Sequence, residues 1–190
     1  MNRQYADPNA PWNPRDPVQI TPEEFEKQVL EWVRACPEAS TAEVEHQAIV
    51  KGQGGEYAID IKIRFTIMGG AILELYLECK HQKRAVERDE VILLEGKLRD
   101  TGAHKGMLFS TSGFQKGAIE YATAHGIATV TVIAGEWLYE TKALGPIPSP
   151  PPWLGLPRFA GIRVEPTKKG VSSHTILPDH LDALSEFLQP

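Results

Sequence analysis

The sequence has few of the features that mark membrane, secreted or disulfide-stabilised proteins. Its 190 residues contain no apolar run long enough to span a bilayer, and the first eight residues lack the apolar core of a signal peptide. The only two cysteines, Cys36 and Cys79, lie far apart, which favours free thiols over a disulfide. These absences predict a reduced, cytoplasmic protein with no membrane anchor.

Several patterns of cofactor and nucleophile chemistry are also missing. The six histidines show no zinc-type spacing, and neither cysteine belongs to a Cys-x-x-Cys pair. The glycine-rich stretch 52–55 is not followed by the Gly-Lys-Ser/Thr of a phosphate-binding loop. No Ser-His-Asp pattern stands out, and we interpret Ser110, Thr111 and Ser112 as strand-end and capping residues. The sequence thus argues against a zinc site, a P-loop and a serine nucleophile.

A basic surplus is absent as well, because the net charge is −5. This argues mildly against tight, indiscriminate binding to nucleic acid. Basic residues nevertheless gather in two local groups: Lys80, Lys83, Arg84 and Arg88, and then Lys97, Arg99, His104, Lys105 and Lys116. Either they form a strip that contacts phosphates, with Lys83, Arg84 and Lys116 as nucleic-acid-binding residues, or they are ordinary solvated charges on helices.

Two carboxylates and a lysine stand out on otherwise apolar stretches. Asp60 interrupts the run 57–65, and Glu78 and Lys80 end the run 75–80. Two acids can hold a divalent cation against a phosphate, while a lysine orients or activates water or stabilises developing negative charge. The set indicates metal-dependent phosphodiester cleavage. The alternative is that these residues are only the solvated face of an amphipathic hairpin.

The turn between the two stretches decides whether the acids meet. Strand side chains alternate between faces, and the predicted apolar face of the first strand holds Tyr57, Ile59, Ile61, Ile63, Phe65 and Ile67. A three-residue loop at 68–70 would place Asp60 opposite Glu78 on the other face. A two-residue Gly-Gly turn would shift the register by one residue and separate them. The metal-site hypothesis therefore requires the three-residue loop or a bulge.

Helix and strand signals alternate along the chain. Thr21, Pro22 and Glu24 predict a helix start, because they supply a cap, a proline at the first position and a capping-box glutamate. The predicted elements are a helix to about Cys36, strands at 44–51, 57–67 and 73–80, a helix at 84–100 capped by Gly102, a strand at 106–111, a helix opened by the capping box Ser112–Gln115 and closed at Gly126, and a strand at 128–133. This order predicts an α/β fold with a mixed sheet flanked by helices.

The two ends of the chain differ from this central part. We expect a Pro-rich arm at 1–20, a core at 21–144, and a Pro-rich segment and tail with a short helix at 145–190. The tail helix is predicted from Pro178 to Leu188, with Leu181, Leu184, Phe187 and Leu188 facing inward. The tail either covers its own domain or is an arm exchanged in a dimer.

The stretch from Thr21 to Leu138 resembles the Mrr-like branch of the PD-(D/E)xK, or restriction-endonuclease, superfamily. The matching pieces come in family order: Phe25-Glu26, the glycine-rich 52–55, Ile59-Asp60-Ile61, Glu78-Cys79-Lys80, the segment 106–114, Ala118, Tyr121-Ala122 and Gly126-Ile127. The resemblance implies a restriction-endonuclease-like three-layer core, with a mixed central β-sheet between helices.

The resemblance also implies roles for individual residues. Asp60 and Glu78 correspond to the metal-binding acids, joined by the main-chain carbonyl of Cys79, and Lys80 corresponds to the catalytic lysine. Glu26 corresponds to a helix glutamate that approaches the metal. The alternative for Glu26 is a boundary residue in a salt bridge. The sequence departs from the family at 56–58, where many relatives have Asp-Gly-Gly, and again just after the lysine.

Together these features predict a magnesium-dependent endodeoxyribonuclease, with manganese as a substitute, acting by direct attack of water on DNA. The family suggests restriction or defence against foreign DNA. Cutting of both strands by a single-site fold predicts a homodimer. The regions outside the core are too short for a DNA-reading domain, so specificity is expected to come from a protein partner or from the tail, or to be absent. The alternatives are a structure-specific repair or recombination nuclease, and a catalytically silent nucleic-acid-binding or scaffold domain.

Overall fold

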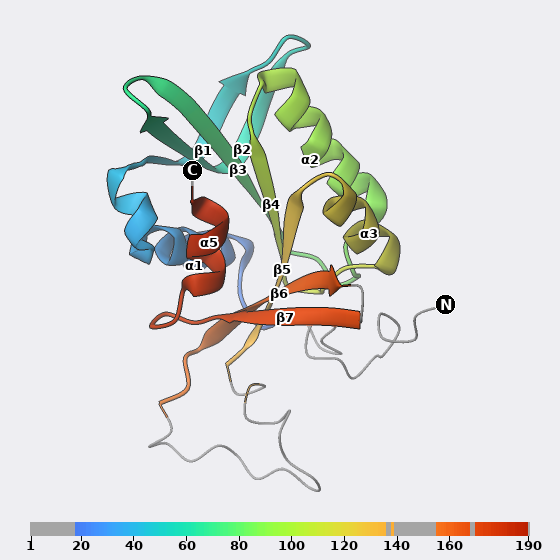
Figure 1. Cartoon of the computed structure of the whole chain (residues 1–190). Helices are drawn as coiled ribbons and strands as arrows, with labels where there is room; N and C mark the ends of the chain where they lie inside the picture. The colour runs from blue at the N-terminus through green and yellow to red at the C-terminus, as the bar shows by residue number, and fades with distance from the viewer. Residues whose placement is uncertain (1–17, 136–137, 139–154, 168–169, 190) are drawn as a thin grey trace, which may run out of the picture.

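The computed structural model describes residues 18–135, 138, 155–167 and 170–189. They form one seven-stranded mixed sheet with helices on both faces, which confirms the predicted α/β fold (Figure 1). The strands are β1 (Glu43–Lys51), β2 (Glu56–Ile67), β3 (Ala71–Lys80), β4 (Lys105–Ser110), β5 (Ile127–Ala134), β6 (Phe159–Thr167) and β7 (Gly170–Ile176). The helices are α1 (Pro22–Ala35), the 3-10 helix η2 (Pro37–Thr41), α2 (Arg88–Thr101), α3 (Lys116–Ala124) and α5 (Asp182–Leu188).

The strand order follows the chain from β1 to β7. The pairs β3–β4 and β4–β5 are parallel, because α2 and α3 provide the crossovers between them. The remaining neighbours are antiparallel. The parallel centre thus brings the carboxyl ends of β3, β4 and β5 to one edge of the sheet.

Helix α1 begins as the sequence predicts. The backbone N–H of Glu24 donates to the Thr21 hydroxyl at 3.2 Å, and the Glu24 carboxylate accepts from the Thr21 N–H at 3.0 Å. Pro22 occupies the first position, and the helix ends at Ala35, with Cys36 as its C-cap ahead of Pro37. This capping satisfies N–H groups that the first helical turn cannot bond internally.

Helices α2 and α3 begin later than predicted, so the predicted starts near Arg84 and Ser112 are wrong. The Val86 N–H donates to the Gly113 carbonyl and the Gln115 N–H donates to the Val86 carbonyl, both at 2.9 Å. The two segments therefore pair with each other in extended conformation before either helix starts. The local capping motifs used to predict the helix starts could not reveal this pairing, because the two segments are far apart in the chain.

Helices α1 and α5 cover one face of the sheet and α2 and α3 the other (Figure 1), and the two larger hydrophobic clusters lie beneath these helix pairs. The first lies under α1 and α5 and includes Phe25, Val29, Val33, Ile61, Ile63, Leu75, Leu77, Phe109, Val130, Leu184 and Leu188. The second lies under α2 and α3 and includes Ile59, Tyr76, Val91, Leu94, Leu98, Leu108, Ala118 and Ala122. Burial of both faces removes the sheet's apolar side chains from water and fixes the strands that carry Asp60 and Glu78.

Strand β2 does not keep a single apolar face, which corrects one prediction. The apolar residues after Asp60 pack in the first core, but Ile59 and Tyr57 before it pack in the second. In the β1–β2 register Gln47 lies opposite Asp60, between two regular pairs, and has a left-handed φ of 54°. This conformation is unusual for a residue other than glycine and disturbs the ladder at that point. The change of face therefore coincides with the position of Asp60.

The described part of the tail extends the sheet. Strands β6 and β7, which the sequence analysis did not predict, add to β5 by antiparallel pairing. The predicted tail helix is present as α5, but it begins at Asp182 and the predicted start at Pro178 is wrong. Leu184 and Leu188 are buried in the chain's own first core, as predicted. The expectations for residues 1–17 and for most of the Pro-rich segment lie outside the described residues. Within the described ranges, no helix is both long and apolar enough to cross a membrane.

Candidate active site

The loop between β2 and β3 has three residues, as the metal-site hypothesis requires. Ile67 pairs with Ala71, which leaves 68–70 as the connection. Its residues have φ values of 47°, 75° and 144°, a run of positive angles that two glycines make accessible. The same register continues to Ile61 opposite Leu77, so Asp60 and Glu78 come next on the two strands.

Asp60 makes a side-chain contact just beyond the last regular pair of the hairpin. Its Oδ2 atom accepts a hydrogen bond of 2.6 Å from the backbone N–H of Cys79. Burial raises the pKa of Asp60, the Cys79 N–H partly offsets that rise, and the charges of Glu78 and Glu26 add to it. Within the described chain, no hydrogen-bond donor contacts the other oxygen, Oδ1. One oxygen thus fixes the carboxylate and the other is available to a ligand.

Glu78 is nearly buried, with 5% of its surface exposed, and lies between two lysines. Its Oε1 atom accepts a hydrogen bond of 2.6 Å from Nζ of Lys97 on α2. Its Oε2 atom lies 3.7 Å from Nζ of Lys80, two residues along β3. Glu78 thus reaches the second-core face of the sheet, and its charge is balanced by lysines from a helix and a strand.

Lys97 is the site residue that sequence reasoning missed. The sequence places it in a basic group that either contacts phosphates or is solvated, and neither interpretation predicts that its Nζ atom binds Glu78 and donates to the Ala58 carbonyl at 3.0 Å. The sequence did contain one indication of this role, because Lys97 lies beside Leu94 and Leu98, which are buried on the side of α2 that packs on the sheet. A lysine at the border of a buried helix face lies close to the sheet, where a carboxylate from a strand can pair with it.

The side chain of Lys80 is accessible to a ligand, whereas that of Cys79 is partly buried in the first core. The Lys80 side chain is 30% exposed at the end of β3, beside Ser110 of β4 in the parallel register. The Cys79 side chain packs against the first core, and burial raises the pKa of its thiol well above the ordinary value. A thiolate is therefore not expected there, and a contribution of Cys79 to a cation would come from its main chain.

Glu26 lies beside the site on α1. Its Oε2 atom is 3.2 Å from Nε2 of His46 and accepts from Nε2 of Gln47 at the same distance. This is the contact expected of a boundary glutamate. Its charge nevertheless raises the pKa of Asp60, so the two carboxylates interact electrostatically.

The donor set fits a hard divalent cation. Asp60 and Glu78 supply carboxylate oxygens and Cys79 can supply a carbonyl oxygen, the ligand types that magnesium prefers. Among the described residues, no three side chains of histidine, cysteine, aspartate or glutamate form a ready-made metal group. Magnesium sites commonly combine one or two carboxylates with waters and substrate phosphates, so a partial protein shell is compatible with that ion.

The three predicted nucleic-acid-binding residues lie close to the carboxyl ends of β3 and β4. Lys83 and Arg84 are exposed in the segment after β3, and Lys116 begins α3. The bridge between Val86 and Phe114 brings these two segments together. Arg84 and Lys116 each make one exposed ion pair with a nearby glutamate, which leaves them accessible to phosphates.

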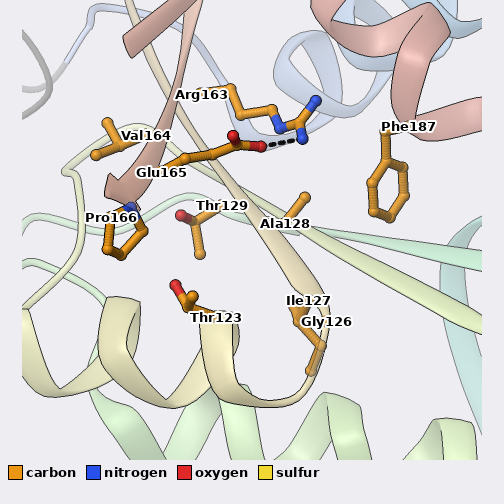
Figure 2. Close-up of a pocket in the computed structure, with 10 residues that line it drawn as sticks. All are labelled: Thr123, Gly126, Ile127, Ala128, Thr129, Arg163, Val164, Glu165, Pro166 and Phe187. Carbon is orange, nitrogen blue, oxygen red and sulfur yellow. Dashed lines mark hydrogen bonds and ion pairs between the residues drawn. The ribbon is translucent and has the colours of Figure 1, made fainter. Parts of the chain in front are cut away.

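A cavity of about 250 Å³ lies elsewhere in the fold and contains none of the site residues. It is lined by α3, β5, β6 and Phe187 of α5, and Figure 2 shows Arg163 and Glu165 paired at its edge. A larger groove of about 690 Å³ runs between α2 and the β1–β2 hairpin and is lined in part by Lys97, Tyr57 and Asp100. The second groove gives solvent access to the α2 side of the site.

Comparison with known proteins gives one family and two similar folds. Residues 18–141 match the Mrr_cat family model, described as restriction endonuclease. No curated protein matches. A solved protein of unknown function, AF1548, has 20% identity and a TM-score of 0.40, covering 52% of this chain and 56% of that one. The DNA modification-dependent restriction endonuclease AspBHI has 22% identity and a TM-score of 0.36, covering 59% of this chain and 33% of that one.

The chain thus spans about half of the first solved protein and a third of the second. The family match is more extensive, because it includes well over half of this chain and all of α1 to β5. Asp60, Glu78, Lys80 and Lys97 all lie inside the matched residues. The chain belongs to the Mrr_cat family of restriction endonucleases.

Proposed function

We propose that the protein is a metal-dependent endonuclease that hydrolyses phosphodiester bonds of DNA with Asp60, Glu78 and Lys80. The main support is the placement of two partly buried carboxylates at the next step of the β2–β3 register, with a lysine 3.7 Å from one of them. Family membership supports a nuclease acting on DNA. An ordinary solvated hairpin face would not bury Glu78 to 5% exposure.

Oδ1 of Asp60, Oε2 of Glu78 and the carbonyl of Cys79 would hold magnesium, for which manganese can substitute. When bound, such a cation neutralises phosphate charge and makes water more acidic. Lys80 would donate a hydrogen bond to the attacking water or to a phosphate oxygen, which stabilises the charge that develops there. Displacement would be in line, with no covalent bond between enzyme and DNA.

Other residues would act on binding. Lys83, Arg84 and Lys116 would contact phosphates along the edge where β3 and β4 end, and their contribution would weaken with salt. Glu26 would act through its charge beside Asp60, while His46 and Gln47 hold it in place. Two copies of the chain would supply one site per strand, a partner protein would supply specificity, and the role would be restriction of foreign DNA.

A DNA-binding domain without catalysis is the second candidate. It is favoured by the 2.6 Å bond between Lys97 and Glu78, because that bond occupies an oxygen of a proposed metal ligand. The two candidates differ in one observable property. A silent domain would bind DNA but would not cut it in any metal.

The deciding experiment is cleavage of supercoiled plasmid in magnesium and in manganese by the wild type and by Asp60→Asn. The asparagine oxygen can still accept the Cys79 N–H bond, so the variant removes charge but keeps shape. Asp89→Asn, in the exposed first turn of α2, is the matched control. We expect cutting by the wild type and the control and none by Asp60→Asn. Equal cutting by all three would refute the proposed site, and DNA binding without cutting in either metal would favour the silent domain over an enzyme that acts alone.

A further inference from the structure

Glu78 has a counter-ion that the proposed chemistry does not require. A single lysine, Lys80, already lies on the Oε2 side of the carboxylate. Lys97 approaches Oε1 from α2 at 2.6 Å, the shorter of the two contacts. The side chain of Glu78 is 7% exposed and that of Lys97 is 25% exposed. Charges with so little solvent around them interact more strongly than surface pairs do.

The position of Lys97 is fixed from a second direction. Its Nζ atom also donates to the carbonyl of Ala58, two residues before Asp60 on β2. The ammonium group therefore joins α2 to both strands of the site, where the regular β2–β3 pairing ends. A lysine held in this way cannot move off Glu78 without also losing the Ala58 bond.

The charges around the site are nearly balanced. Asp60, Glu78 and Glu26 provide negative charge. The charges of Glu78 and Glu26 raise the pKa of Asp60, so the three carboxylates interact. Lys80 and Lys97 offset most of that charge. A divalent cation that approaches Oε2 of Glu78 meets repulsion from two ammonium groups, and Lys97 on Oε1 already neutralises the carboxylate charge that would attract the cation. A DNA phosphate would bring a negative charge and restore the attraction.

We propose that Lys97 is an internal counter-cation that competes with the divalent metal for Glu78 and makes metal binding depend on DNA. The inference rests on the proposed function, because it concerns the same site. Lys97 is a positioning residue in this scheme, since it acts through Glu78. The result would be an enzyme whose site fills with metal mainly when DNA is bound.

A purely structural lysine would behave differently. If Lys97 only fastened α2 to the sheet, its removal would lower the free energy of unfolding and leave the metal affinity of the folded protein unchanged. If it competes with the cation, its removal must tighten metal binding. Metal affinity therefore separates the two roles without any measurement of cleavage.

The test is the affinity of the full chain for manganese without DNA, measured by titration calorimetry. The variants are Lys97→Met, which keeps the apolar stem, and Lys97→Arg, which keeps the charge. Arg99→Met is the matched control, because it removes a charge from the same helix at an exposed residue whose ion pair, among the described residues, is with Glu95. We expect Lys97→Met to bind manganese about tenfold more tightly. That is the size of change expected when one positive charge is removed close to a half-buried metal site. Lys97→Arg and Arg99→Met should stay near the wild type.

A second titration adds a short DNA duplex, with calcium in place of manganese. The duplex should raise the calcium affinity of the wild type more than that of Lys97→Met, because the variant already lacks the competing charge. Circular dichroism and thermal unfolding establish that each variant is folded. If Lys97→Met does not fold, Lys97→Gln gives the same comparison.

The outcomes separate this inference from the proposed function. Metal binding that Asp60→Asn abolishes, but that Lys97→Met leaves unchanged or weakens, would overturn the role of Lys97 and keep the site. Tighter binding by Lys97→Met that is lost when Asp60→Asn is added would support both. No binding that depends on Asp60 in any variant would overturn both.

Discussion

Two clusters of partly buried charged side chains lie in different regions of this molecule, and they differ in how many of their charged groups have a partner. Around Arg163 on β6, the guanidinium pairs with Glu165, lies 3.5 Å from Glu186 and donates to the Ala183 carbonyl at 2.8 Å. That cluster joins β6 to α5 and has a partner for each charge. Around Asp60, an oxygen has no donor in the described chain, and the neighbouring strand contains a left-handed residue. We call the Arg163 cluster closed, because its charged groups pair with one another, and the Asp60 cluster open, because a carboxylate oxygen there lacks a donor among the described residues. An open acceptor is the arrangement that a ligand site would need.

The largest effect should come from the open cluster. Replacement of Lys80 by methionine keeps the side-chain stem and removes the group proposed to act on water or phosphate. We expect the rate of plasmid cleavage to fall about a hundredfold or more, the range for one electrostatic donor, with little change in thermal stability. Lys27→Met is the control, since it removes the same charge from an exposed ion pair with Glu23 on α1, away from the site. A similar loss of rate in both variants would mean that overall charge, and not Lys80, controls cleavage.

The closed cluster should respond in stability and not in activity. Arg163→Met leaves the carboxylates of Glu165 and Glu186 without their cation and the Ala183 carbonyl without its donor. We expect urea unfolding to show a loss of about 1–2 kcal/mol, between the values for exposed and buried ion pairs. Arg99→Met, which removes one exposed pair, should cost less than about 0.5 kcal/mol. A change in manganese affinity for Arg163→Met would show that the two regions are coupled.

The same contrast explains what the sequence could reveal. The start of α1 and the loop at 68–70 are local patterns, and the hairpin register that aligns Asp60 with Glu78 follows from the loop length. Lys97 and the strands β6 and β7 depend on contacts between distant segments. Strand β7 is polar at Ser172, Ser173 and His174, so it has no alternating apolar pattern that would predict it. Local chemistry predicted the two acids, but only tertiary packing could bring the second lysine to them.

The smallest expected effect is the pH dependence of stability that Asp60 contributes. Burial raises the pKa of Asp60 above its ordinary value, so the folded protein binds this proton more tightly than the unfolded chain. Stability from this group is therefore greatest at low pH and falls as pH rises from the unfolded pKa through the raised folded pKa. Above that window the ionised carboxylate carries a constant cost, which Asp60→Asn removes.

Urea unfolding of Asp60→Asn and the wild type between pH 4 and pH 7 tests this sign. We expect the variant to be the more stable protein at pH 7 and the difference to shrink as the pH falls. Asp89→Asn, at an exposed residue, is the control for the same change of side chain. A variant that is less stable at pH 7 would mean that the Cys79 N–H bond is stronger to the ionised carboxylate than to asparagine by more than the cost of burying the charge. The site would then resemble the closed cluster around Arg163, where ionised groups stabilise the fold.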